Sequence, residues 1–176
     1  MGGGRGEDDG PSDRSPHRDR QDGRELALAA LCHLDGAGGD PRESLEVFWS
    51  SPPQDEEGKA VTARVALDGD ARRFADGLVQ VAVSRADTVD GTIREVSRRW
   101  RLERMDVVDR NVLRLAVVEL LDGAGPPIGV VTSEAVRLAA AYGSERSSKF
   151  VNGVVAELAA RLRAPGTGEK TGEAGV

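Results

Sequence analysis

The stretch GSERSSKFVNGVV, residues 143–155, decides how this chain folds. The pair Asn152-Gly153 is normally a turn signal. The apolar residues around the pair nevertheless recur at helical steps of three and four, namely Phe150, Val151, Val154, Val155, Leu158 and Leu162. This spacing predicts a final helix that begins near Ser147 or Ser148, runs through the Asn-Gly pair and ends before Pro165.

The chain before this stretch shows the same helical spacing. Helices are predicted over residues 24–34, 41–49, 71–86, 89–100, 107–121 and 134–142. Their expected start signals are Asp40 with Pro41 and Glu43, Thr88, Asp106, and Thr132 or Ser133. The segment IGVVT, residues 128–132, is expected to be a connector. No polar–apolar alternation is long enough to predict a sheet, so the predicted fold class is all-α, a compact bundle of six or seven helices.

Composition divides the 176 residues into three parts. Residues 1–20 are expected to form a disordered Arg/Asp/Gly-rich arm and residues 164–176 a disordered tail, because neither segment has enough apolar surface to offset its ordering entropy. Residues 21–163 are expected to form one helical domain, with a loop at 51–58. No apolar run approaches the roughly 18 residues that span a membrane. The single cysteine, Cys32, and the absence of a secretion signal favour a cytoplasmic location.

Charge is unevenly distributed along the chain. The net charge of −6 argues against a nucleic-acid partner. The segment from Arg94 to Arg114, however, contains seven arginines and four acidic residues, and the segment from Arg137 to Arg163 contains five basic and two acidic residues. Both segments therefore carry a local charge of +3. They are either solvated helix faces or part of a surface that binds an anionic partner.

No motif in the sequence points to catalysis. The only histidines are His17 and His33, and His33 directly follows Cys32, so the two side chains would point about 100° apart on a helix. A zinc site is therefore not expected, and Cys32 is interpreted as a small buried residue rather than a nucleophile. No P-loop and no dinucleotide fingerprint is found. We expect no enzyme activity, no metal and no cofactor.

The start of the final helix favours binding instead. Ser147 and Ser148 are expected to cap the helix and leave backbone N–H groups free to bind a phosphate. Lys149 adds a cation, and Phe150 offers a ring on which an unpaired base can stack. Gly153 is expected to admit a neighbouring helix closely, with Asn152 bonded to a loop. The alternative is that Phe150 is core, Lys149 is solvated and the Asn-Gly pair serves packing only.

These residues resemble a known family. SSKFVNGVV resembles the final-helix motif of NusB-type transcription antitermination factors. The segments RELALAALCHLD, FADGLVQVAVSRADTVDGTI, DRNVLRLAVVELL and PPIGVVTSEAVRLAAAYG resemble the earlier helices of that family in the same order. The resemblance covers residues 24–163 and implies an all-α fold of two small helical bundles packed across each other.

The resemblance also implies a function. NusB-type factors bind a single-stranded RNA element, boxA, in ribosomal RNA transcripts, together with a ribosomal small-subunit protein, and help RNA polymerase pass terminators. Their RNA contacts lie in a basic N-terminal arm and at the start of the final helix. Carried over by position, the matching residues are Arg24 in the arm and Ser147, Ser148, Lys149 and Phe150 at the helix start. Arg18 and Arg20 of the same arm, and Arg146 just before the serines, complete the candidate RNA-binding residues. Asn152 and Gly153 match the motif as structural residues.

Two alternatives stay open. Asp19 and Asp22 interrupt the basic arm and oppose phosphate binding, so the chain could be a NusB-like protein-interaction module with weak or lost RNA binding. An enzyme reading would require a catalytic domain, such as the RNA methyltransferase domains that follow some NusB-like domains, and we expect none in the dozen residues after position 163. The oligomeric state, monomer or homodimer, is also left open.

Overall fold

The computed structural model describes residues 16–51 and 69–163, and these ranges contain seven α-helices, one short 3₁₀ helix and no strand. The helices are α1 (Pro16–Ala37), α2 (Pro41–Ser50), α3 (Gly69–Ser84), α4 (Ala86–Val96), the 3₁₀ helix η1 (Leu102–Arg104), α5 (Val107–Leu121), α6 (Ile128–Tyr142) and α7 (Ser147–Leu162). The expected all-α fold is confirmed. None of the helices in these ranges combines the length and apolar character needed to cross a membrane.

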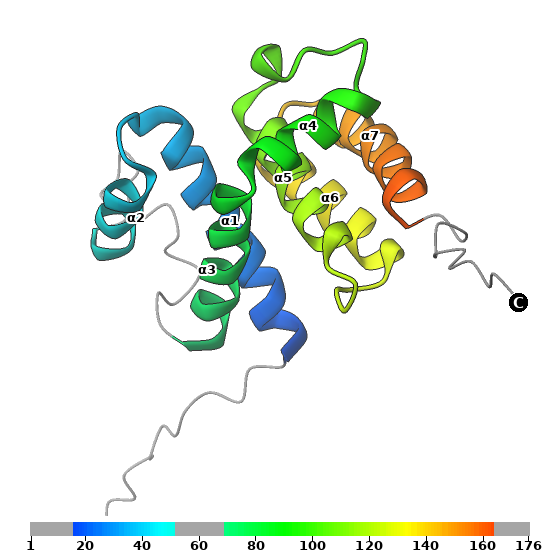
Figure 1. Cartoon of the computed structure of the whole chain (residues 1–176). Coiled ribbons are helices and arrows are strands. Elements are labelled where there is room, and N and C mark those ends of the chain that lie inside the picture. The colour runs from blue at the N-terminus through cyan, green and yellow to red at the C-terminus, as the bar shows by residue number, and fades with distance from the viewer. Residues whose placement is uncertain (1–15, 52–68, 164–176) are drawn as a thin grey trace, which may run out of the picture.

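The helices form two groups, α1–α3 and α4–α7, which lie side by side as the resemblance implied (Figure 1). Helix α5 lies in the second group at the junction with the first: it contacts α1 and α3 across the junction and α4, α6 and α7 within its own group. Ten of its fifteen residues are buried. The core around it consists mainly of Leu, Val and Ala, with Phe48 the largest fully buried side chain.

Arg24 and Glu119 join the two groups through a buried ion pair. Arg24 Nε donates to Glu119 Oε2 at 3.0 Å and Nη2 donates to Oε1 at 2.7 Å, and both side chains are at most 5% exposed. Arg137 Nη1 adds a second link between the groups by donating to Glu25 Oε1 at 2.6 Å. These contacts position α5 and α6 against α1.

The glycine at a close helix crossing is Gly23. A Cβ atom at Gly23 would lie 2.7 Å from the carbonyl oxygen of Ala71 and 2.7 Å from Phe74 Cδ1. Helix α1 therefore packs on α3 with a backbone approach that a larger residue would disturb.

The helix boundaries agree with the sequence at α2, α5 and α7 and differ at α1, α3, α4 and α6. Asp106 occupies the N-cap position of α5, as expected, but makes no capping side-chain bond. Asp40 caps α2 by accepting a hydrogen bond from the Arg42 N–H at 2.7 Å, as expected. Thr88 does not cap α4: it lies inside the helix, which begins at Ala86. Residues 16–20, expected in the disordered arm, form the first turns of α1. Residues 1–15, 52–68 and 164–176, with the rest of the predicted arm, tail and loop, lie outside the described residues.

Helix α6 begins earlier than expected. IGVVT is its first turn rather than a connector, and Thr132 and Ser133 are helical residues rather than caps. Their hydroxyls donate to the carbonyls of Ile128 and Val130, both at 3.0 Å. The β-branched run is helical because Val131 packs into the core at 1% exposure, and this burial outweighs a small difference in helix propensity.

Candidate nucleic-acid interface

The turn before α7 uses Ser147 in a way the sequence did not indicate. Ser147 is 1% exposed, and its Oγ accepts a hydrogen bond from the Ser144 N–H at 2.9 Å. The backbone N–H of Ser147 donates to the carbonyl of Ser144 at 3.0 Å. Residue Arg146 occupies the N-cap position, without a capping side-chain bond. The prediction that the serines cap α7 is therefore wrong, because the Ser147 hydroxyl closes the preceding turn.

Lys149 and Phe150 reach the surface in the first turn of α7. Lys149 is exposed, and Phe150 is half-buried with one part of its side chain against the core. The ring of Phe150 meets the ring of Trp100 edge to face, with centroids 5.8 Å apart and planes inclined by 69°. Phe150 therefore packs against the core and still keeps part of its side chain accessible, so a role in the core and a role in base stacking are compatible.

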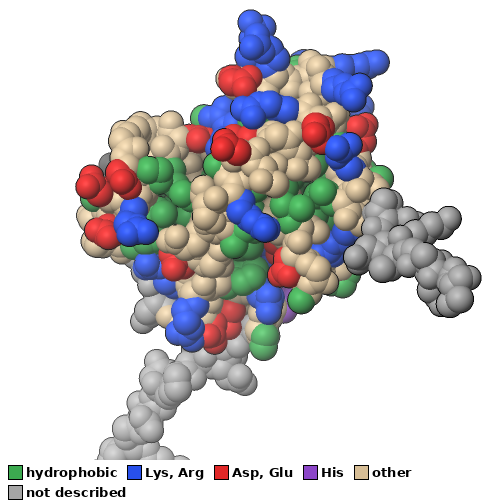
Figure 2. Space-filling view, in the orientation of Figure 1, with side chains coloured by type: hydrophobic (Ala, Val, Ile, Leu, Met, Phe, Trp, Pro, Cys, Tyr) green, Lys and Arg blue, Asp and Glu red, His purple; other side chains and the backbone are tan. Residues whose placement is uncertain are grey.

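Trp100 belongs to the segment between α4 and α5, residues 97–104, which we call the Arg-rich loop. The loop contains Arg98, Arg99, Arg101 and Arg104, all exposed, and Trp100 itself is 62% exposed. Figure 2 shows Lys and Arg side chains gathered at this edge of the molecule, over the α4–α5 connection and α7. The sequence signal was the +3 segment from Arg94 to Arg114, but it did not single out Trp100.

The arm residues lie elsewhere. Arg24 is buried in the pair with Glu119, so its guanidinium is not available to RNA. Arg20 is exposed and stacks over the Phe74 ring with its Cζ 5.0 Å from the centroid, and Arg18 is also exposed. Arg20 lines a hollow with Pro126, beyond the C-terminal end of α5, whereas Trp100 and Phe150 meet near its N-terminal end. The length of α5 separates the two groups by about 20 Å.

Asn152 and Gly153 are both exposed on α7. A Cβ atom at Gly153 would meet no atom within 4 Å in the described part of the molecule, so the prediction of a close helix crossing at this position is wrong. A glycine within a helical pattern does not by itself predict a close helix crossing, because Gly23 lies at such a crossing and Gly153 faces open space. Nothing in the structure explains the Asn-Gly pair.

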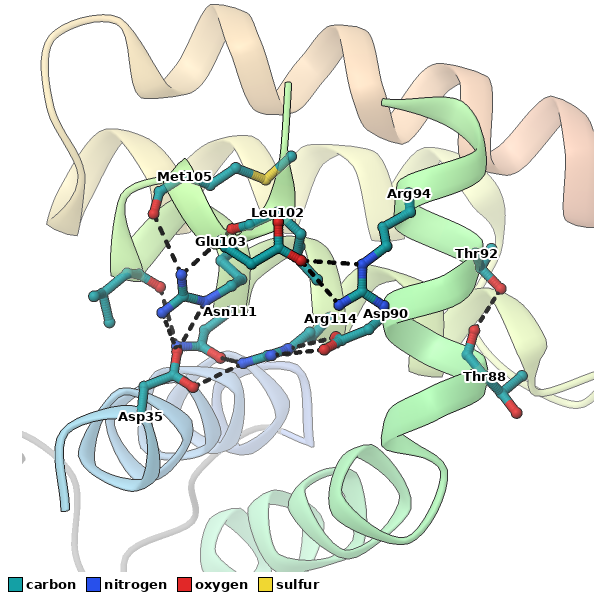
Figure 3. Close-up of polar contacts among 12 residues, drawn as sticks. Asp35, Thr88, Asp90, Thr92, Arg94, Leu102, Glu103, Met105, Asn111 and Arg114 are labelled. Carbon is teal, nitrogen blue, oxygen red and sulfur yellow. Dashed lines mark hydrogen bonds and ion pairs between the residues drawn. The ribbon is translucent and has the colours of Figure 1, made fainter. Parts of the chain in front are cut away.

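A polar network joins three helices next to the Arg-rich loop (Figure 3). Asp35 at the end of α1 accepts hydrogen bonds from Arg110, Asn111 and Arg114 on α5 at 2.8–3.1 Å. Burial raises the pKa of the Asp35 carboxyl, but these α5 hydrogen bonds and charges outweigh it and hold the pKa below its ordinary value. Arg114 also donates to Asp90 on α4 at 2.7 and 2.9 Å. The network therefore joins α1, α4 and α5 beneath the loop.

Cys32 and His33 have structural surroundings. Cys32 Sγ lies 3.6 Å from Asn111 Nδ2, and burial raises the pKa of the thiol. The His33 ring packs against Phe48 with centroids 5.4 Å apart. Across residues 16–51 and 69–163, no group of three or more His, Cys, Asp or Glu side chains is arranged to hold a metal ion.

The fold and this surface define an all-helical, two-bundle protein with an aromatic and cationic face at the start of its last helix. The model of the NusB family matches residues 21–160. The chain therefore belongs to the NusB family.

Individual relatives agree with this assignment. The chain is 41% identical over 143 residues to the transcription antitermination protein NusB of Sorangium cellulosum, covering 81% of this chain and 93% of the relative. It is also 41% identical over 146 residues to the protein of the same name from Myxococcus xanthus, covering 83% and 98%.

Solved structures show the same fold. The T. maritima NusB structure superposes with a TM-score of 0.63 at 33% identity, covering 80% of this chain and 89% of that one. A structure of antitermination factors NusB and NusE in complex with dsRNA gives a TM-score of 0.64 at 29% identity, covering 82% and 98%.

Proposed function

We propose that this protein is a non-catalytic, RNA-binding transcription antitermination factor. It binds boxA-type single-stranded RNA in ribosomal RNA transcripts together with a ribosomal small-subunit protein, within the RNA polymerase antitermination complex in the cytoplasm. The observation that carries this proposal is the exposed surface formed by Lys149, Phe150 and the Arg-rich loop.

The charge of this surface suits a nucleic acid. The segments 94–104 and 145–149 contain seven basic residues against three acidic ones, a net +4 within a chain whose total is −6. Two of the acids are already paired, Glu103 with Arg94 and Glu95 with Arg161. In the described ranges, no hydrogen bond or ion pair engages the side-chain cations of Arg98, Arg99, Arg104, Arg146 or Lys149. Unpaired cations of this kind release counterions on binding phosphate.

The candidate RNA-binding residues fall into two groups, one at the start of α7 and one on α1. Arg146, Ser148, Lys149 and Phe150 stay in the proposed interface, with the Ser147 hydroxyl shaping the turn below them. Arg18 and Arg20 lie about 20 Å away along α5, so they bind only RNA long enough to reach both ends of that helix.

Two observations favour an alternative function as a protein-interaction module: Arg24 is buried, and the arm residues lie far from the start of α7. A NusB-like protein-interaction module would use this fold to bind the ribosomal protein with little contribution from RNA. Titration of the purified protein with a boxA-like RNA and a scrambled control, with and without the ribosomal protein, distinguishes the two functions.

The test uses two salt concentrations and one matched pair of variants. Lys149→Ala is expected to weaken RNA binding and to flatten the slope of log affinity against log salt by about 0.7, the value for one phosphate contact on a single strand. Arg42→Ala is the control, because Arg42 is an exposed cation on α2, in the other bundle. Equal binding of the boxA-like and scrambled RNAs, with unchanged binding of the ribosomal protein, would favour the interaction module.

A further inference from the structure

We propose that Trp100 is a second base-stacking platform beside Phe150, so that the Arg-rich loop and α7 together hold two unstacked bases of a single-stranded RNA. This inference rests on the proposed RNA-binding function and adds to it a residue outside the final-helix motif. Trp100 has the largest aromatic side chain on this face and is 62% exposed. Such exposure forgoes the stabilisation that burial of an indole gives the fold.

The geometry of the two rings specifies which RNA fits. Their planes are inclined by 69° with centroids 5.8 Å apart. Bases stacked on the two rings are therefore splayed apart and cannot stack on each other. A strand whose bases are already unpaired adopts this arrangement readily, whereas a duplex has to be unwound first.

Hydrogen bonds fix the backbone of Trp100 within the Arg-rich loop, and the Phe150 ring contacts its side chain. The Trp100 backbone N–H donates to the carbonyl of Ser97 at 2.8 Å, and the buried Ser97 hydroxyl donates to the carbonyl of Trp100 at 3.2 Å. On the other side of Trp100, Leu102 is 2% exposed and anchors η1 in the core. A ring carried on a backbone that is fixed before binding loses less conformational entropy when a base stacks on it.

Further bonds hold the rest of the loop. Arg94 Nε and Nη2 donate to Glu103 Oε1 at 3.3 and 3.2 Å, as Figure 3 shows. Arg110 Nη1 donates to the carbonyls of Leu102 and Met105, both at 3.4 Å. The loop is therefore connected to α4 and α5 at several points around Trp100.

The charges around Trp100 favour RNA over a protein surface. Arg98 and Arg99 precede it directly and are exposed, and no ion pair engages either guanidinium within the described part of the chain. Two unpaired cations adjoining a flat ring match the backbone and base of one nucleotide.

Abasic substitution of the RNA tests the stacking directly. In the wild-type protein, removing the base that lies on Trp100 is expected to weaken binding by about 5- to 150-fold, the effect of losing one stacked base. In Trp100→Ala the same abasic RNA is expected to bind as well as the intact RNA does, while the base on Phe150 still contributes. Trp100→Phe should restore most of the affinity, and the salt slope should stay unchanged because no ionic contact is lost.

Fluorescence gives an independent reading. The chain has two tryptophans, and Trp49 lies in the first bundle against Phe48, with centroids 4.8 Å apart. The Trp49→Phe protein therefore reports on Trp100 alone, and its emission is expected to be quenched by the boxA-like RNA and not by inorganic phosphate.

The outcomes separate this inference from the proposed function. If the wild-type protein binds no single-stranded RNA, the proposed function is wrong. If the wild-type protein binds RNA but folded Trp100→Ala shows the same affinity and the same abasic penalties, Trp100 is not a platform. If Trp100→Ala lowers affinity for the ribosomal protein only, the residue contacts protein and the inference is overturned. Circular dichroism of each variant verifies folding.

Discussion

Arg24 on α1 and Glu119 on α5 form a bidentate, almost fully buried ion pair across the junction of the two bundles. The family resemblance placed Arg24 in the RNA-binding arm. Its position instead makes it a link between the bundles. Removal of one partner leaves the other charge buried and unpaired, which costs far more than the intact pair contributes.

Arg24→Ala is therefore expected to lower the free energy of unfolding by about 3–5 kcal/mol. Urea denaturation measures this loss. The double variant Arg24→Met with Glu119→Leu should recover most of it, because neither charge of the pair remains and the nearby buried Glu134 keeps its hydrogen bonds from Gln21 and Arg137. If the Arg24→Ala protein were as stable as the wild type but bound RNA more weakly, Arg24 would be an RNA-binding residue and the structural role would be contradicted.

Gly153 and Gly23 are expected to respond to alanine in opposite directions. Gly153→Ala should stabilise the protein by up to about 1 kcal/mol, because the added methyl enters open space and alanine is the better helix former. Gly23→Ala should destabilise it by about 1–3 kcal/mol, because the methyl would overlap Ala71 and Phe74 on α3. Thermal unfolding of both variants measures the two changes in stability. If both variants were stabilised, or both destabilised, the packing described at these glycines would be contradicted.

Asp109 is expected to make stability depend on pH. Burial raises the pKa of its carboxyl, with the Ser147 hydroxyl opposing the rise. A carboxyl whose pKa is raised by folding stabilises the protein below its unfolded pKa, about 3.9, and this contribution is lost as pH rises through the folded pKa. Asp109→Asn should thus match the wild type at low pH and be more stable at neutral pH. Urea unfolding at pH values from about 3 to 7 measures the difference, and a variant less stable than wild type at pH 7 would contradict it.

Arg18 should matter only for long RNAs. It is exposed on the first turn of α1, about 20 Å along α5 from Phe150. Arg18→Ala is expected to leave the affinity of a short oligonucleotide unchanged and to weaken a several-fold longer one at low salt. Filter binding across an RNA length series measures this, with Arg42→Ala as the control. Equal losses at every length would mean that α1 and α7 bind the same few nucleotides.

The sequence predicted the helices better than their ends. Periodicity depends on burial, and a strongly apolar helix such as α5 keeps its pattern whatever precedes it. Capping depends on which of several hydroxyls the local turn uses: Thr132 and Ser147 carry plausible capping groups that the fold uses otherwise, and Thr88 lies inside α4 rather than before it. The sequence did not indicate a binding role for Trp100, because an aromatic residue at a helical step predicts a side chain packed in the core. Only the structure shows that α4 ends at Val96, before Trp100.

The pairing of Arg24 with Glu119 also affects synthesis of the chain. Ninety-five residues separate the two partners. At translation rates of about 5–20 residues per second, Arg24 waits roughly 5–20 s after it is made before its carboxylate partner is made. During that interval α1 can pack only on α2 and then α3. The first bundle therefore emerges from the ribosome with the Arg24 charge solvated at its open side, and this charge is buried only when α5 brings its partner.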